Sequence, residues 1–389
     1  MNLCRLSDIA NIEISGVDKK SVDGETPVRL CNFVDVYRNW AITQNLLKSF
    51  MIASAKETEI AKCSIHKGQV AITKDSETRD DIGISAYIAD DFDDVLLGYH
   101  CALITPNEDI LDGKYLNAFM HTSYIQKYFE NSASGSGQRY TLSNETIFQI
   151  PILLPSLRVQ KAIGNLLSNI DRKIELNRQI NDNLEKMAKQ LYDYWFVQFD
   201  FPDENGRPYK SSGGAMVWNE KLKREIPKHW NDGILSDIAN ITMGQSPEGS
   251  SYNEVGEGII FYQGSTDFGI RFPDIRQYTT APSRYANKGD ILMSVRAPVG
   301  ALNIANNDCC IGRGLSAINS LSSKVGSMTH LYYTMNYFRL RFEDMNSAGT
   351  TFGSITKDEL YSLPIVLPAH DVLLLFEKIC APIYDKQMV

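Results

Sequence analysis

Polar, glycine-rich loops carry the side chains best suited to chemistry in this 389-residue chain. They are residues 73–83, 97–101 and 131–141 in the first half, and 243–254, 261–272, 294–300, 310–315 and 346–354 in the second half. Their arginines match the hydrogen-bonding edge of guanine, their glutamines and asparagines match that of adenine, and their hydroxyls and backbone amides suit phosphates. These groups are the ones that DNA base reading requires, although loops that merely connect strands have a similar composition.

The known catalytic motifs are missing from the sequence. It has no G-x-x-x-x-G-K-[ST] phosphate loop, no H-E-x-x-H, no G-x-S-x-G elbow, no G-x-G-x-x-G after a strand, and no N/D-P-P-[YF] segment of a DNA amino-methyltransferase. The six histidines are far apart, and the acidic stretch 89–94 is typical of a solvated loop rather than a cation site. The seven scattered cysteines favour reduced thiols over disulfides or a metal site. The sequence therefore favours binding over catalysis and predicts no structural metal.

Composition and charge fit a folded protein that binds nucleic acid only locally. The chain is 43% hydrophobic and 22% charged, with a net charge of −8. This negative charge argues against a protein that holds DNA over its whole surface, so DNA contacts must come from local patches or be shared with a partner. The longest aliphatic run, near 372–376, is too short to span a membrane, and no secretory signal is present. We expect a cytoplasmic protein.

The heptapeptide LSDIANI occurs twice, at 6–12 and at 235–241. The similarity continues in order, because HKGQVAIT (66–73) corresponds to NKGDILMS (287–294), and a longer segment ending in "IPILLP" corresponds to one ending in "LPIVLP". Both octapeptides predict a turn followed by a strand. Each copy of the repeated sequence combines short strand-like runs with helical patches such as 329–345. The pattern predicts two homologous α+β domains.

A long helix is expected between the two copies. Ser156 is a suitable N-cap, and apolar residues then recur by four and three in a heptad seam, which spans more than an ordinary helix, roughly 60 Å. A core helix of a single domain is the alternative. The second copy begins a matching helix in which Phe376, Cys380 and Ile383 take equivalent places. The seam consists of Ile163, Leu167, Ile170, Ile174, Asn177, Asn181, Leu184, Ala188, Leu191 and Trp195.

The order of these segments resembles the specificity subunits of type I restriction-modification systems. The most specific part is IPILLPSLRVQKAIGNLLSNIDRKIELNRQINDNLEKMAKQLYDYWF (150–196), supported by IPKHW (226–230) and by YQGSTDFG, SVRAPVG and CIGRGL in the second copy. The resemblance implies two target recognition domains, each reading half of a split DNA site, related by a pseudo-two-fold axis and separated by antiparallel coiled-coil helices. The expected division is 1–155 and 230–368 for these domains, 156–199 for the spacer helix, 200–229 for a linker and 369–389 for the start of the second helix.

The same resemblance implies that this chain is non-catalytic and carries no cofactor. Two methylation subunits with S-adenosylmethionine are implied to dock on the helices, and ATP hydrolysis with Mg²⁺ and cleavage are implied for restriction subunits. Partner subunits would supply much of the phosphate neutralisation. The candidate DNA-contacting residues, taken from the polar loops, are Lys74, Ser76, Thr78, Arg79, Tyr99, Ser136, Gln138, Arg139, Gln245, Ser246, Tyr252, Gln263, Ser265, Thr266, Arg271, Ser294, Arg296, Arg313, Thr350 and Thr351.

Two other functions stay open at this stage. One is an orphan or truncated copy that acts as a coiled-coil scaffold. The other is a self-contained restriction-modification enzyme, although this sequence lacks the catalytic motifs that such an enzyme needs. The second helix is shorter than the resemblance implies, so we also expect the seam to support self-association or to need a partner chain.

Overall fold

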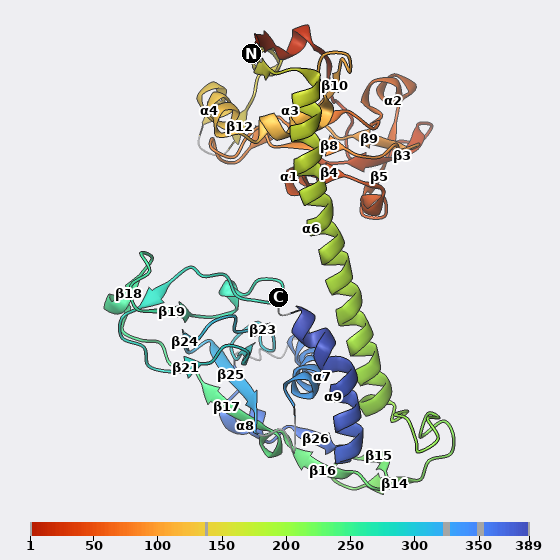
Figure 1. Ribbon diagram of the computed structural model, residues 1–389, viewed down its shortest axis with the longest axis vertical. Coiled ribbons are helices and arrows are strands. Elements are labelled where there is room, and N and C mark those ends of the chain that lie inside the picture. The colour runs from red at the N-terminus through yellow and green to blue at the C-terminus, as the bar shows by residue number, and fades with distance from the viewer. Residues whose placement is uncertain (1, 137–138, 322–326, 348–353, 388–389) are drawn as a thin grey trace. The chain divides into compact units, whose positions relative to one another are not determined.

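The computed structural model describes residues 2–136, 139–321, 327–347 and 354–387 (Figure 1). The chain divides into two compact units, residues 1–179 and 180–389. The long helix α6 (Leu157–Tyr192) begins directly after Ser156 and contributes residues to both units.

A five-stranded mixed sheet forms the centre of unit 1. Val70 and Ile72 pack in one apolar cluster, whereas Ala71 packs in another, so alternate residues of one strand enter two cores. Both faces of the sheet are therefore covered, which explains why this strand is buried along its whole length. The strand order is β2 (Ala10–Ile14), β10 (Cys101–Pro106), β6 (Val70–Thr73), β8 (Ser85–Ile88) and β4 (Ala41–Ile42).

Smaller sheets and short helices complete unit 1. The other strands are β1 (Asn2–Arg5) with β13 (Pro151–Leu154), then β5 (Met51–Ala55), β3 (Thr26–Cys31) and β9 (Val95–Leu97), and β11 (Ser134–Ser136), β12 (Arg139–Thr141) and β7 (Asp75–Ser76). The helices are α1 (Phe33–Arg38), α2 (Glu57–Cys63), α3 (Gly113–Met120), α4 (Ser123–Ser132) and α5 (Asn144–Phe148).

Unit 2 is built on two main sheets and two longer helices. One sheet has the order β17 (Ala239–Met243), β25 (Leu315–Ser320), β22 (Ile291–Ser294) and β23 (Leu302–Ile304). The other has the order β18 (Tyr252–Asn253), β20 (Tyr278–Thr279), β19 (Ile259–Tyr262), β24 (Cys309–Ile311) and β21 (Tyr285–Ala286). The remaining elements are β14 (Met216–Asn219), β15 (Arg224–Pro227), β16 (Asn231–Ile234), β26 (Pro364–Leu367), α7 (Met328–Ser347), α8 (Lys357–Tyr361) and α9 (His370–Gln387).

The predicted duplication is confirmed by the repeated heptapeptide, which folds in the same way in both units. Each copy forms a 3-10 turn, Leu6–Asp8 or Leu235–Asp237, that leads into a strand of the central sheet. The Leu6 N–H donates to the Ile150 carbonyl at 3.0 Å, and the equivalent Leu235 N–H donates to the Leu363 carbonyl at 2.9 Å. Both leucines are fully buried. The heptapeptide is thus a structural entry into each domain.

Helix α6 is held at its two ends by different kinds of contact. Near its start, the buried Gln160 side chain accepts from the Asp112 N–H at 3.0 Å and donates to the Ile110 and Pro155 carbonyls, which fixes the helix to unit 1. At the other end, Ala188 of α6 and Trp195 of the π-helical turn Asp193–Val197 that follows it are buried in an aromatic cluster with residues of α9. Figure 1 shows that α9 and this part of α6 lie side by side and run in opposite directions.

The middle of the predicted seam stays open on the described surface. Ile163, Ile170 and Ile174 are 38%, 48% and 46% exposed, and both seam asparagines are exposed. The spacing that predicted a seam is present, but in the described structure α9 covers only its last turns.

Residues 200–229 differ from the expected linker. Asp203 and its neighbours do form turns, but β14 and β15 pair as a hairpin, and Phe201 and Trp230 stack with ring centroids 4.8 Å apart. Phe201 and Trp230 are buried in the same cluster as Trp195, and this burial of apolar surface orders a segment whose composition suggests flexibility.

None of the described helices is long and apolar enough to cross a membrane. The cysteines are free thiols, and all except Cys4 are buried.

Candidate nucleic-acid interface

In unit 1, a small sheet brings together candidates that are far apart in sequence. Strands β11, β12 and β7 pair antiparallel, with Ser136 opposite Arg139 and Tyr140 opposite Ser76. Ser76 and Arg139, 63 positions apart in the sequence, thus lie on adjacent strands. The described loop residues Thr78 and Arg79 are exposed beside this sheet, and the Arg79 guanidinium lies 5.4 Å from the centroid of the Tyr140 ring.

The Asp75 carboxylate organises the exposed edge of this sheet. Its Oδ1 accepts from the Thr141 hydroxyl at 2.5 Å, and its Oδ2 accepts from Arg139 Nη2 at 3.0 Å and from the Nδ1 of His100. Burial alone would raise the pKa of Asp75, but the hydrogen bonds from Thr141, His100 and Arg139 together hold the pKa below its ordinary value. Asp75 is therefore an ionised group that ties three donors together.

Arg139 and Tyr99 project from this cluster. The Arg139 side chain is 60% exposed, and its pKa is raised first by the hydrogen bond to Asp75 and further by Tyr99. The Tyr99 ring lies against the His100 ring, with centroids 3.5 Å apart. Lys74 is half-buried and donates to Asn144 Oδ1 at 3.1 Å, which leaves it less available than Arg139. Gln138 lies outside the described residues, as does the side chain of Ser136.

In unit 2, glycines allow three candidate loops to approach closely. A Cβ added at Gly244 would lie 2.1 Å from the Gly312 carbonyl oxygen, and one added at Gly314 would lie 2.7 Å from that of Gln263. The Gln245 N–H donates to the Ile311 carbonyl at 3.0 Å. Only residues without side chains fit at these contacts, so the glycine-rich composition of the loops is a consequence of their packing.

Exposed polar side chains gather where these loops meet. The backbone N–H of Arg313 donates to Ser246 Oγ at 3.3 Å, and that of Gln263 donates to Asp267 Oδ2 at 2.7 Å. Gln245, Gln263 and Arg313 are themselves exposed. Ser265 and Thr266 stand in the neighbouring 3-10 turn Ser265–Asp267. This surface offers amide, hydroxyl and guanidinium groups, which can hydrogen-bond base edges and phosphates.

Three candidates in unit 2 already have internal partners. Arg271 is only 15% exposed and pairs with Glu185, with 2.9 Å between Nη1 and Oε2. Ser294 is 1% exposed and accepts from the Ala301 N–H at 2.9 Å while donating to the Pro298 carbonyl at 2.6 Å. Tyr252 donates to the Pro247 carbonyl and stacks on Phe261 with centroids 4.8 Å apart. The geometries of Arg271 and Ser294 suit structural roles, and we leave these two out of the interface proposed below, whereas the partly exposed Tyr252 is kept.

The three remaining candidates of unit 2 are Arg296, Thr350 and Thr351. Arg296 is exposed in the loop after β22. Thr350 and Thr351 lie outside the described residues.

Sequence reasoning missed Asp75, His100 and Thr141, because a single Asp, His or Thr in a loop gives no signal of the strand pairing that joins them.

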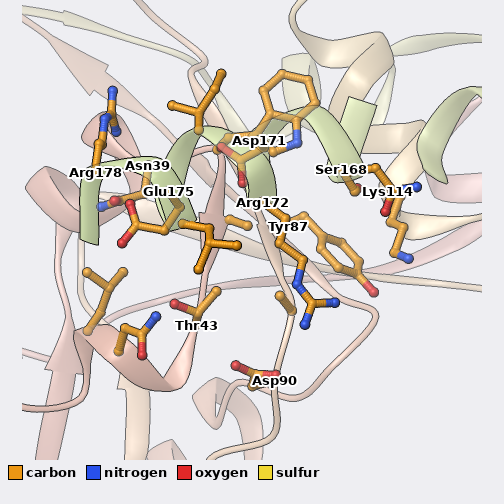
Figure 2. A pocket seen from close by; sticks show the side chains of 18 of the residues that line it. Asn39, Thr43, Tyr87, Asp90, Lys114, Ser168, Asp171, Arg172, Glu175 and Arg178 are labelled. Atoms are coloured by element: carbon orange, nitrogen blue, oxygen red, sulfur yellow. The ribbon is translucent and has the colours of Figure 1, made fainter. Parts of the chain in front are cut away.

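Unit 1 also contains a charged groove between α6 and the β4 edge of the sheet (Figure 2). Its volume is about 750 Å³. Arg172 of α6 points into it, and Tyr87 and Lys114 also line it, with Lys114 next to Ser168 of α6. Burial raises the pKa of Asp171, and nearby Glu175 raises it further. The mixed charges suit a polar macromolecular surface rather than an apolar small molecule.

Comparison with known proteins agrees with a duplicated DNA-specificity fold. A family model described as the type I restriction modification DNA specificity domain matches residues 1–186 and 227–372. The chain is 32% identical over 327 residues to a protein of Methanocaldococcus jannaschii provisionally named the type I restriction enzyme MjaX specificity subunit, covering 83% of this chain and 73% of that protein. It is 22% identical over 391 residues to the type I restriction enzyme HindI specificity subunit of Haemophilus influenzae, covering 84% and 83% respectively.

The fold also resembles the crystal structure of a type I restriction-modification system S subunit from M. genitalium. The TM-score is 0.60 with 13% sequence identity, over 99% of this chain and 90% of that chain. Fold, duplication and sequence define a protein of the two-domain DNA-specificity class. The chain belongs to the type I restriction modification DNA specificity family, whose subunits are non-catalytic.

Proposed function

We propose that this chain reads a bipartite DNA target for a type I restriction-modification enzyme, unit 1 reading one half and unit 2 the other. The observation that carries the proposal is the duplication itself, in which each unit presents an exposed arginine, Arg139 or Arg313, among polar side chains from separate loops. The chain would direct the methylation and restriction subunits to its target. The proposed contacts are Lys74, Ser76, Thr78, Arg79, Tyr99, Ser136, Gln138 and Arg139 in unit 1, and Gln245, Ser246, Tyr252, Gln263, Ser265, Thr266, Arg296, Arg313, Thr350 and Thr351 in unit 2.

The proposed partners explain how an acidic chain can act on DNA. With a net charge of −8, the chain depends on local basic groups, and partner subunits would neutralise most of the phosphates. Two methylation subunits, which bind S-adenosylmethionine, would dock along α6, where the groove beside Arg172 offers charged groups. Restriction subunits with ATP and Mg²⁺ would join them in the cytoplasm. The division into domains at 1–155, 156–199, 200–229, 230–368 and 369–389 belongs to the same proposal.

A second candidate function, a coiled-coil interaction protein, draws on the exposed apolar residues of α6. Leu166 and Ile170 are 62% and 48% exposed, which is unusual for large apolar side chains in a heptad pattern. Light scattering at micromolar concentration separates the possibilities: a stable dimer supports self-association through α6, and a monomer counts against it.

The proposed function is tested by mapping methylated bases in the DNA of cells that express a cognate methylation subunit with or without this chain. We expect methylation at a limited set of sequences only when the chain is present. Methylation that is absent in both cultures, or identical in both, would contradict the proposal. In vitro, binding of the complex to DNA should weaken steeply with salt, because phosphate contacts release counterions.

A further inference from the structure

We propose that Asp75, His100 and Thr141 are positioning residues that hold the Arg139 guanidinium for reading one DNA base in unit 1. The inference deepens the proposed function and rests on it. Asp75 and His100 are only 16% and 19% exposed, whereas the Arg139 side chain is 60% exposed. The arginine is therefore held at one nitrogen by a half-buried cluster while most of its surface faces solvent.

An anchored arginine differs in function from a mobile one. A guanidinium reads guanine through two donors that must meet O6 and N7 together, so its plane has to be fixed. A long side chain that is ordered before binding also loses less conformational freedom on binding. A phosphate contact is less demanding, because a flexible cation such as lysine can also make it as a point charge. The bond between Arg139 Nη2 and Asp75 Oδ2, 3.0 Å long, therefore favours base reading over backbone contact.

The carboxylate itself is fixed from both sides. The Thr141 hydroxyl occupies Oδ1 at 2.5 Å, and the His100 ring donates to Oδ2 through Nδ1. Since an ionised carboxylate only accepts hydrogen bonds, Nδ1 carries the proton in this arrangement. Arg139 Nη2 also lies 2.9 Å from this nitrogen, and because both groups are donors this is a close contact rather than a hydrogen bond, in which the two share Asp75 Oδ2 as acceptor.

The backbone around His100 supports this role. His100 has a φ of 71°, in the left-handed region that a non-glycine residue adopts at some cost. Its carbonyl accepts from the Lys74 N–H at 2.8 Å, and the Lys74 carbonyl accepts from the Leu142 N–H at 2.8 Å. Three segments distant in sequence are thereby fastened around Asp75. A strained conformation held this firmly is typical of a functional position.

Matched variants separate positioning from folding. Asp75→Asn keeps the shape of the side chain but removes its charge. His100→Asn tolerates a positive φ and places an amide N–H where Nδ1 stands, whereas His100→Asp has the same shape and the same tolerance but can only accept and repels Asp75. Arg139→Ala removes the reader itself. Each variant is expressed with the methylation subunit, and the methylated positions in the DNA of the host cell are mapped.

The wild-type map must first show a limited set of sequences, because without it the proposed function fails rather than this inference. Given that map, Asp75→Asn, His100→Asp and Arg139→Ala should all accept additional bases at one position of one half-site, with methylation of those sites rising about tenfold. His100→Asn should keep the wild-type map. Melting temperatures of the purified complexes control for folding.

Two results would overturn the inference. One is an unchanged map for Asp75→Asn with Arg139→Ala relaxed, which would show that Arg139 needs no anchor. The other is the same map for His100→Asn and His100→Asp, because a purely structural role would treat the two alike.

Discussion

Nη1 of Arg271 lies 2.9 Å from Oε2 of Glu185, and this ion pair fastens the loop after β19 to α6 within unit 2. The guanidinium also lies 5.2 Å and 5.1 Å from the ring centroids of Tyr332 and Tyr384. Arg271 is thus held by a carboxylate and two aromatic rings, while Arg313 is exposed at the meeting point of the polar loops.

This contrast makes Arg271 and Arg313 a matched pair. Arg313→Ala should change the methylated sequence at one half-site and leave the free energy of unfolding nearly unchanged. Arg271→Ala should leave the sequence unchanged and lower the free energy of unfolding by about 2 kcal/mol, because Glu185 and two rings lose their partner. Methylation mapping and urea unfolding of both variants provide the check. A sequence change in Arg271→Ala alone would reverse the assignment.

Gly164 tests how α6 attaches to unit 1. A Cβ there would lie 2.8 Å from both Lys114 Cβ and the Tyr115 backbone nitrogen. Gly164→Ala should therefore destabilise unit 1 by about 1–3 kcal/mol through overpacking, although alanine is the better helix former. The exposed Ala162 supplies the control, since Ala162→Gly should cost only about 1 kcal/mol from helix propensity. Urea unfolding followed by circular dichroism compares them, and a stabilised Gly164→Ala would show that the packing is loose.

The buried His330 and the partly buried Glu377, whose Oε1 lies 3.3 Å from the His330 backbone nitrogen, predict opposing pH dependences in unit 2. Burial lowers the pKa of His330 to about 4, so its contribution to stability is lost as pH falls from 6.5 towards 4. Burial raises the pKa of Glu377 to about 7, so the folded carboxyl keeps its proton and stability falls as pH rises from 4.5 to 7. The two slopes nearly cancel in the wild type.

Removing either side chain should leave only the pH dependence of the free energy of unfolding that the other side chain causes. In His330→Phe, stability should decrease by up to about 3 kcal/mol between pH 4.5 and 7, and in Glu377→Gln it should increase by a similar amount. Tryptophan fluorescence during urea unfolding reports on the cluster around Trp195. Parallel pH curves for the wild type and both variants would contradict these assignments.

Much of the fold follows from local sequence patterns. The doubled heptapeptide, the turn and strand after each repeated Lys-Gly pair, and the heptad seam all predicted elements that the structure contains, because periodicity and turn residues act locally. The order in 200–229 was not predictable, since it depends on Phe201 and Trp230 joining a cluster with residues of distant helices, Tyr333 of α7 and Phe376 of α9.

The proposed interface shows the same contrast between local sequence patterns, which could be read, and long-range contacts, which could not. Composition singled out the loops that contain both arginines, but it could not distinguish Arg139, which is exposed, from Arg271, which is paired. That distinction depends on Asp75 and Glu185, which lie far from the two arginines in sequence. Long-range pairing of single polar residues leaves no periodic trace.

The gap between the two halves of the methylated sequence tests the central claim most directly. Residues 177–183 are exposed on α6 apart from the Gln179 side chain, and duplicating them adds one heptad, about 10 Å of helix, which corresponds to about three base pairs. If one helix carries two readers, the variant should methylate the same two half-sites with the gap lengthened by about three base pairs. An unchanged gap, or new half-site sequences, would contradict the account.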